Sequence, residues 1–142
     1  NYNCITSIAH PFGPLWTNLL KYIKRTDDGI KIINKIDALE VVCGEQRRRS
    51  NIRAINFNFF LNKSFTGGSD AHILSEYGKV VTCADSSNVE GFLDSIAKKN
   101  NFVVGKEIGV IKRIVSYSNI LKKHTRTLNS WVKDNYQRIK YK

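Results

Sequence analysis

Residues 66–72 read Thr-Gly-Gly-Ser-Asp-Ala-His, which sets a carboxylate and an imidazole two positions apart behind a pair of glycines. Glycines let the backbone turn sharply at the end of an extended run, so the polar residues that follow lie at a strand end, where functional side chains converge. Asp70 and His72 are both suitable ligands for Zn, Mn or Fe. The alternative is a polar turn in which Ser69 and Asp70 bond the local backbone and His72 has no role.

The composition is that of one globular domain. The chain has 142 residues, of which 42% are hydrophobic, enough to bury a core. No run approaches the roughly 18 apolar residues of a membrane span, and the first residues lack the pattern of a secretory signal. We therefore expect a cytoplasmic protein with no membrane contact. Cys4, Cys43 and Cys83 lie far apart, and we expect them to be reduced and packed as small apolar side chains.

The net charge of +11 is concentrated in the last quarter of the chain. Residues 110–142 hold nine Lys and Arg against one acidic residue. We expect residues 1–109 to form one domain and residues 110–142 a basic helical extension. This tail is a candidate for electrostatic nucleic-acid binding, and the alternative is a pair of amphipathic helices that pack on the domain.

Apolar runs alternate with helical patterns along the first 109 residues. The expected strands cover residues 4–9, 38–43, 65–68, 79–83 and 102–105, and an acidic turn at residues 26–29 closes an expected helix over 15–25. Because strands alternate with helices of ten or more residues, the pattern predicts parallel βαβ units and an α/β fold.

Two further helices are expected between these strands. Residues 45–62 have helical spacing, with Ile52, Ile55, Phe59 and Phe60 as the buried stripe. Residues 87–99 open with Ser87 and Glu90 in the spacing of a capping box.

Polar residues follow three of the expected strands, where functional groups gather in parallel α/β folds. His10 follows the first strand, Glu40 lies in the second and Asp70 and His72 follow the third. Arg47 and Arg48, in the basic run after the second strand, are candidates for a substrate phosphate, because guanidinium matches phosphate oxygens. The alternative for this run is a solvated helix start.

In these positions the sequence resembles the C-terminal part of the PHP (polymerase and histidinol phosphatase) family of metal-dependent phosphoesterases. The resemblance covers roughly residues 1–107, and its matching pieces are Ile-Ala-His-Pro-Phe at 8–12, Ala-Leu-Glu-Val at 38–41, Gly-Gly-Ser-Asp-Ala-His at 67–72, Glu-Tyr-Gly-Lys at 76–79 and the closing unit 89–105. It implies a distorted (β/α)₇ barrel that hydrolyses phosphate esters with up to three divalent metal ions.

The resemblance also assigns roles to individual residues. His10, Asp70 and His72 match metal ligands, which would hold the metal-bound water that attacks the phosphate. Glu40 matches a position behind the ligands, and Ser69 is placed to orient Asp70 by a hydrogen bond. Cys43 stands where the family often has Asn.

The family's amino-terminal His-x-His motif and the His and Glu ligands that follow it are missing from this chain, and the third histidine, His124, lies in the tail. The chain also contains no Met. We therefore expect a C-terminal fragment of a PHP protein that is weak or inactive alone. Its partner would be the N-terminal part of the same barrel, or a second copy paired through an open sheet edge.

Three functions are compatible with these patterns. The leading hypothesis is hydrolysis of a small phosphomonoester or nucleotide by metal-activated water. The alternatives are a nuclease acting on short oligonucleotides, and a non-catalytic remnant that binds nucleic acid or a protein through the basic tail.

Overall fold

The computed structural model describes residues 4–13 and 27–109, together with 111–114, 118, 121–122 and 125–126 of the tail. The chain divides into two units, Asn1–Ile108 and Gly109–Lys142. The described residues after 110 are helical. The helices expected over 15–25 and over the last part of the tail lie outside the described residues. Among those that are described, no helix has the length and apolar character needed to cross a membrane.

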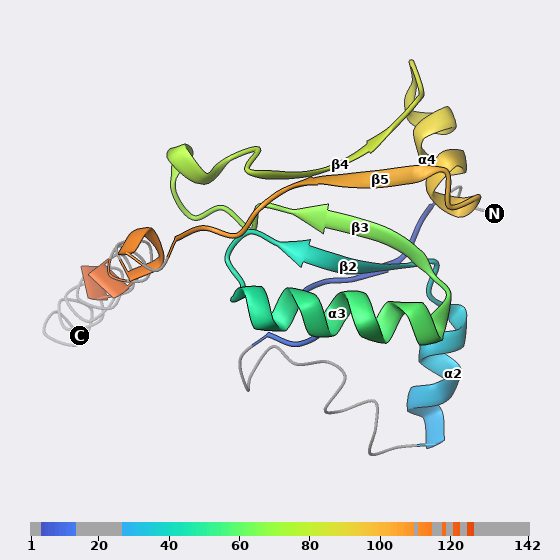
Figure 1. Cartoon of the computed structure of the whole chain (residues 1–142), viewed down its shortest axis with the longest axis horizontal. Coiled ribbons are helices and arrows are strands. Elements are labelled where there is room, and N and C mark those ends of the chain that lie inside the picture. Colours follow the sequence, from blue (N-terminus) through green and yellow to red (C-terminus); the bar gives the residue numbers. More distant parts are fainter. Residues whose placement is uncertain are drawn as a thin grey trace, which may run out of the picture. The chain divides into compact units, whose positions relative to one another are not determined.

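The first unit is organised around a parallel sheet of three strands in the order β1-β2-β3 (Figure 1). The strands are β1 (Ser7–Ile8), β2 (Ala38–Cys43) and β3 (Ser64–Gly68). The core cluster consists of Ile8, Leu39 and Val41. Parallel pairing here is as expected, but β1 is shorter than the predicted 4–9, because Thr6 bonds the carboxylate of Asp37 with its backbone N–H.

Helix α2 (Asp27–Lys35) corrects one expectation. The acidic turn at 26–29 was expected to end a helix, whereas Asp27 and Asp28 begin one. Acidic side chains favour the first turn of a helix because they face its free N–H groups. Asp28 also pairs with Lys31 one turn later, at 2.9 Å.

Helix α3 (Arg48–Leu61) lies along β2, as Figure 1 shows. Its expected buried stripe is confirmed only for Ile55, which packs against the core, and is wrong for Ile52, Phe59 and Phe60, which are exposed. The buried residues are Asn51, Ala54 and Asn58. Phe59 is 70% exposed and Phe60 87%. The side-chain amide of Asn51 bonds both the N–H and the carbonyl of Cys43, and that of Asn58 bonds the carbonyl of Lys63. These hydrogen bonds allow asparagine side chains to be buried on the face of α3 that packs against the sheet.

Strands β4 (Val80–Ala84) and β5 (Asn101–Gly105) form an antiparallel ribbon beside β3 (Figure 1). The prediction of parallel pairing is wrong for this pair. The link from β3 to β4 holds only the short turn η1 (Leu74–Glu76), which reverses the direction of the chain, and the longer link after β4 reverses it again, so β5 runs antiparallel to β4. Thr82 bonds the N–H and carbonyl of Gly67, and Ser69 does the same for Val80, so hydroxyl groups join the ribbon to β3.

Helix α4 (Val89–Ala97) forms where expected, but its cap is Asn88 rather than Ser87. The side chain of Asn88 accepts a hydrogen bond from the N–H of Gly91 at 2.7 Å. The cap therefore lies one residue later than expected, and the residue three positions after it is Gly91, so the expected capping box of Ser87 and Glu90 is wrong. Asn is as good a cap as Ser, so spacing to a glutamate alone did not decide between them.

The α/β class is confirmed. The described strands form one sheet of three strands and one of two, and they do not themselves show a barrel. All three cysteines are free, as expected; Cys43 is buried, but Cys4 is exposed instead of packed.

Candidate metal-binding edge

The carboxyl ends of the parallel strands bring three of the predicted residues to one edge of the sheet. The backbone N–H of His10, after β1, donates to Oε2 of Glu40 in β2 at 2.6 Å. Opposite the end of β2, the thiol of Cys43 donates to Oδ2 of Asp70, after β3, at 3.7 Å. One carboxylate thus contacts the first strand end and a second contacts β2.

Two of these residues have a backbone conformation that is unfavourable for any residue other than glycine. His10 has φ 29° and Asp70 has φ 48°, both in the left-handed region. Such a conformation costs about 1 to 2 kcal/mol in a residue other than glycine. The surrounding structure compensates this cost at both expected ligands, which is a pattern typical of functional sites.

The edge is held together by backbone contacts around Gly44. Its N–H donates to the carbonyl of Gly68 at 2.9 Å, and its carbonyl accepts from the N–H of Ile108 at 2.8 Å. A Cβ at Gly44 would lie 2.7 Å from the carbonyl oxygen of Ser69. Only glycine therefore lets β2 approach the residue that precedes Asp70.

A bulge in β2 adjoins Glu40. Glu40 pairs with Thr66 and Val42 with Gly67, so Val41 is an extra residue on β2. Bulges of this kind change the direction of neighbouring side chains and are frequent beside active sites. A Cβ at Gly68 would lie 3.0 Å from Oε1 of Glu40, so glycine on β3 leaves room for this carboxylate.

The charges at the edge are predominantly negative. Burial raises the pKa of Glu40, the N–H and the charge of His10 oppose this rise, and Asp70 adds a smaller increase. Burial, followed by the charges of Glu40 and Asp70, raises the pKa of Cys43 to about 12. Cys43 therefore stays a thiol that can donate to Asp70, and a cation would relieve the repulsion between the two carboxylates.

His72 and Ser69 are placed differently from the rest. The His72 side chain is exposed, and its backbone N–H donates to Oε2 of the buried Glu76 at 3.2 Å. The Ser69 hydroxyl bonds Val80 on the ribbon. Ser69 would therefore position Asp70 only by fixing the backbone between these two neighbouring residues, and not by a hydrogen bond to its carboxylate.

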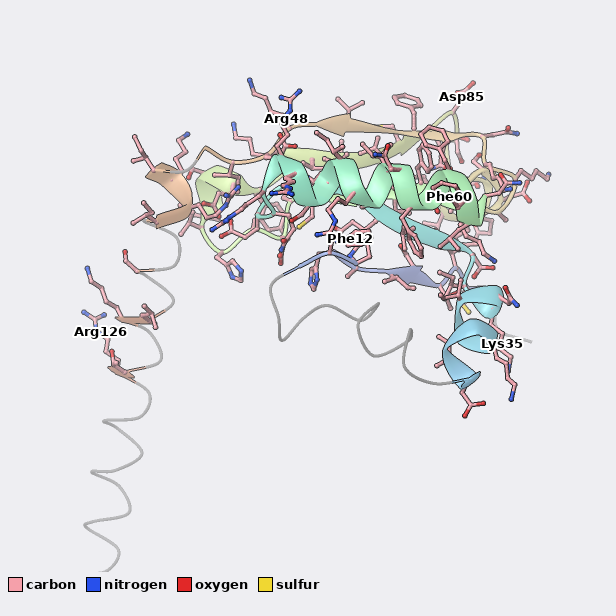
Figure 2. All side chains as sticks on the ribbon, turned by 60° about the horizontal axis from the view of Figure 1, so that its bottom comes forward. Phe12, Lys35, Arg48, Phe60, Asp85 and Arg126 are labelled. Atoms are coloured by element: carbon pink, nitrogen blue, oxygen red, sulfur yellow. The ribbon has the colours of Figure 1, made fainter. Side chains whose placement is uncertain are left out.

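Arg47 and Arg48 lie at the start of α3 and are exposed (Figure 2 labels Arg48). Arg47 is the N-cap residue and makes no capping hydrogen bond with its side chain. Arg48 lines a cavity of about 230 Å³ with Asn51 and Glu107, among other residues. Asn51 and Glu107 share a hydrogen bond of 3.3 Å there, a contact between residues 56 positions apart that the sequence pattern did not predict.

The residue types at this edge are ones that bind divalent metal ions in proteins. No three or more His, Cys, Asp or Glu side chains within them are grouped to hold a metal ion, so His10, Asp70 and His72 do not meet as a set. The Nδ1 atom of His10 is nevertheless buried and has no hydrogen-bond partner among the described residues. An imidazole nitrogen of this kind has a lone pair with which it could bind a metal ion.

Residues 48–101 match the model of the PHP-associated family. The resemblance to the C-terminal part of the PHP family is confirmed over this segment, which runs from the start of α3 to the start of β5. The match includes Asp70 and His72, whereas His10 and Glu40 precede it. No curated protein and no solved structure matches the chain.

Proposed function

We propose that this chain supplies one side of the metal site of a PHP-type phosphoesterase that hydrolyses a phosphomonoester or a nucleotide. His10, Asp70 and His72 are the ligands in this proposal, and Glu40 and Ser69 orient them. Up to three ions of Zn, Mn or Fe would supply a hydroxide at neutral pH and stabilise the phosphate oxygens. The remaining ligands come from the other part of a (β/α)₇ barrel, contributed by an N-terminal part or by a second copy.

The observation that carries the proposal is the convergence of His10, Glu40 and Asp70 at one strand edge, with left-handed backbone at His10 and Asp70. The match of residues 48–101 to the PHP-associated family supports it independently of the geometry. The exposed position of His72 fits a ligand that turns toward an ion when one binds.

Within this proposal, this chain's own groups have separate tasks. The N–H of His10 holds one oxygen of Glu40, which leaves the other oxygen to accept a proton or a ligand N–H. The Cys43 thiol fixes one oxygen of Asp70 and leaves its second free to bind. Arg48 lies exposed at the start of α3, where a guanidinium can contact a substrate phosphate.

The decisive test measures the metal content of the intact gene product, with the remaining part of the proposed barrel present, and its activity on a phosphomonoester. Asp70→Ala should lower the bound metal and reduce activity by about 100-fold, because even residues behind metal ligands change affinity or activity 10- to 100-fold. His72→Ala should also lower the metal content, although its side chain is exposed. An absence of metal, or unchanged activity in Asp70→Ala, would overturn the proposal.

Asp85→Ala is the matched control. Asp85 is an exposed aspartate in the loop that follows β4, and Figure 2 labels it. Because β4 runs antiparallel to β3, as the bonds of Thr82 to Gly67 and of Ser69 to Val80 indicate, Asp85 lies at the opposite end of the sheet from Asp70. Its removal should leave metal content and activity unchanged.

The proposed partner can be tested through the open edge of β1. Among the described strands, β1 pairs only with β2. Ser7→Pro would add a proline to this edge strand, which should weaken pairing with an incoming strand. A change in the mass of the assembly, measured by light scattering, would support pairing through β1; an unchanged assembly that retains metal would rule out that edge.

A further inference from the structure

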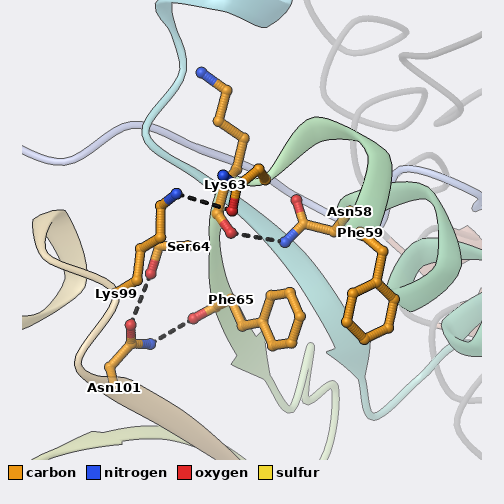
Figure 3. Close-up of a pocket in the computed structure, with 8 residues that line it drawn as sticks. Asn58, Phe59, Lys63, Ser64, Phe65, Lys99 and Asn101 are labelled. Carbon is orange, nitrogen blue, oxygen red and sulfur yellow. Dashed lines mark hydrogen bonds between the residues drawn. The ribbon is translucent and has the colours of Figure 1, made fainter.

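A second site lies at the other end of the sheet, and it does not depend on the proposed phosphoesterase activity. It is a cavity of about 300 Å³ at the C-terminal end of α3 and the amino ends of β3 and β5 (Figure 3). The lining that matters here is Asn58, Phe59, Lys63, Phe65, Lys99 and Asn101. The volume is at the lower end of the range for small-molecule sites.

One wall of the cavity is aromatic. Phe59 and Phe65 meet edge to face, with ring centroids 6.0 Å apart and an interplanar angle of 84°. Phe59 is 70% exposed, so much of this ring has no partner in the fold. An exposed ring that is held at a fixed angle beside a cavity offers a surface on which a planar group can stack.

The charge of the cavity is positive. Its lining contains two lysines and no acidic residue. The ammonium of Lys99 donates to Oδ1 of Asn62 at 3.0 Å, and that of Lys63 to the carbonyl of Asn34 at 3.1 Å. Both partners are neutral. Among the described residues neither lysine forms an ion pair, whereas the neighbouring Lys98 pairs with Asp94 at 2.6 Å.

Lys99 also occupies an unfavourable position. Its φ is 60°, just beyond the end of α4, where glycine is the usual residue. The side chain is not needed to cap the helix, because the backbone N–H groups of Lys98, Lys99 and Asn100 already bond the carbonyls of its last turn. The Lys99 ammonium is held by its bond to Asn62, and Figure 3 shows the ammonium of Lys63 pointing away from the other labelled side chains.

Hydrogen bonds connect the residues at the floor of the cavity. Asn101 accepts from the hydroxyl of Ser64 and donates to the carbonyl of Phe65. Asn58 donates to the carbonyl of Lys63, but its Oδ1 is buried and has no partner within the described part of the chain.

From these contacts we infer that the cavity binds a small molecule that combines a planar ring with a phosphate group, such as a nucleoside monophosphate. Phe59 stacks on the ring and Lys99 holds the phosphate. Lysine is a common phosphate ligand, and aromatic side chains stack on nucleobases.

The experiment is calorimetric titration of the full chain with AMP in the presence of a chelator, with adenosine and inorganic phosphate as separate probes. AMP should bind more tightly than either. Lys99→Gly should weaken AMP binding by about tenfold, since it removes a charge-assisted hydrogen bond while relieving the backbone. Phe59→Ala should weaken it by about fivefold or more.

Neighbouring residues provide matched controls. Lys98→Ala and Phe60→Ala alter the adjacent lysine and the adjacent exposed aromatic, and neither residue lines the cavity. Both should change AMP affinity less than about twofold, a difference of about 0.4 kcal/mol. Equal losses in Lys98→Ala and Lys99→Gly would show attraction to a basic surface and would overturn the site.

Other outcomes separate this site from the proposed metal edge. Asp70→Ala should leave AMP binding in chelator unchanged. If Asp70→Ala abolished binding instead, AMP would sit at the carboxyl edge and this inference would fail, while the phosphoesterase proposal would stand. Inorganic phosphate binding as tightly as AMP, or no saturable AMP binding, would also overturn it.

Discussion

The two ends of the parallel sheet differ in how far side chains add to the backbone hydrogen bonds between the strands. At the carboxyl end, backbone atoms meet directly, because Gly44 bonds both Gly68 and Ile108 through its N–H and carbonyl. At the amino end, backbone bonds such as that from the N–H of Ser64 to the carbonyl of Asp37 are supplemented by side chains: the Asp37 carboxylate accepts from Thr6, and Asn101 joins β5 to β3. Where the backbone holds the strands, side chains such as His10 and Asp70 remain available for binding.

Each end also carries two residues other than glycine in left-handed conformation. They are His10 and Asp70 at the carboxyl end, and Asn62 and Lys99 at the amino end. Asn62 ends α3, and asparagine tolerates this conformation well. Lys99 lies one residue beyond the C-cap of α4, and its N–H and that of Asn100 bond the carbonyls of the last turn, so its conformation also belongs to a helix end. His10 and Asp70 have no such explanation from helix capping, and both belong to the proposed metal site.

The largest effect on stability is expected at the carboxyl end from Gly44→Ala. The new methyl group would lie 2.7 Å from a backbone oxygen, so β2 and β3 must separate. We expect a loss of about 2 to 3 kcal/mol, measured by urea unfolding. Gly109→Ala is the control, because no atom lies within 4 Å of a Cβ there. Equal stability of the two variants would show that backbone contact does not hold this end.

The amino end should respond to removal of a side chain. Asn101→Ala deletes hydrogen bonds to Ser64 and Phe65 and leaves the carbonyl of Phe65 without that donor. A loss of about 2 kcal/mol is expected in the same unfolding assay. Asn100→Ala changes an exposed neighbour and should cost less than about 0.5 kcal/mol. If both variants were equally stable, the contrast between the two ends would be wrong.

A smaller effect of opposite sign is expected from Lys99→Gly. Glycine adopts φ 60° without strain, so the protein should gain about 0.5 to 1 kcal/mol. Asp70→Gly tests the same relief at the carboxyl end, where φ is 48°. Urea midpoints that rise in both variants would show that each end stores strain; a fall in both would show that the side chains stabilise the fold instead.

The strand pattern could be predicted from the sequence because apolar runs bounded by glycine and polar residues leave few alternatives. Strand β2 covers the predicted residues, and His10 and Glu40 were expected near each other. The inner face of α3 could not be predicted, because its asparagines are buried by bonds to residues outside the helix. Helical spacing assigns apolar residues to the interior and contains no information about such partners.

The pairing of the ribbon was missed for a related reason. A helix between two strands was taken to indicate a parallel crossover, yet α4 connects the antiparallel strands β4 and β5. The hydroxyl groups of Ser69 and Thr82, which join the ribbon to β3, are common surface residues without a recognisable spacing. Likewise, the importance of Gly44 depends on a contact with Ser69 that exists only in the folded chain.

The smallest effect tests the amino end by pH. The hydrogen bonds from the Thr6 hydroxyl and then from its backbone N–H lower the pKa of Asp37. A lowered pKa stabilises the fold above the unfolded value of about 3.8, and the gain is lost as pH falls through the folded pKa. Because Asp37 is exposed, the contribution should stay below about 0.5 kcal/mol. Asp37→Asn should therefore lower the urea midpoint slightly near about pH 6 and make no difference near about pH 2.

Thr6→Val should reproduce the larger part of this change in the urea midpoint, since it deletes the stronger of the two hydrogen bonds to Asp37. A gap that persists at low pH would mean that Asp37 holds this end by packing rather than by charge.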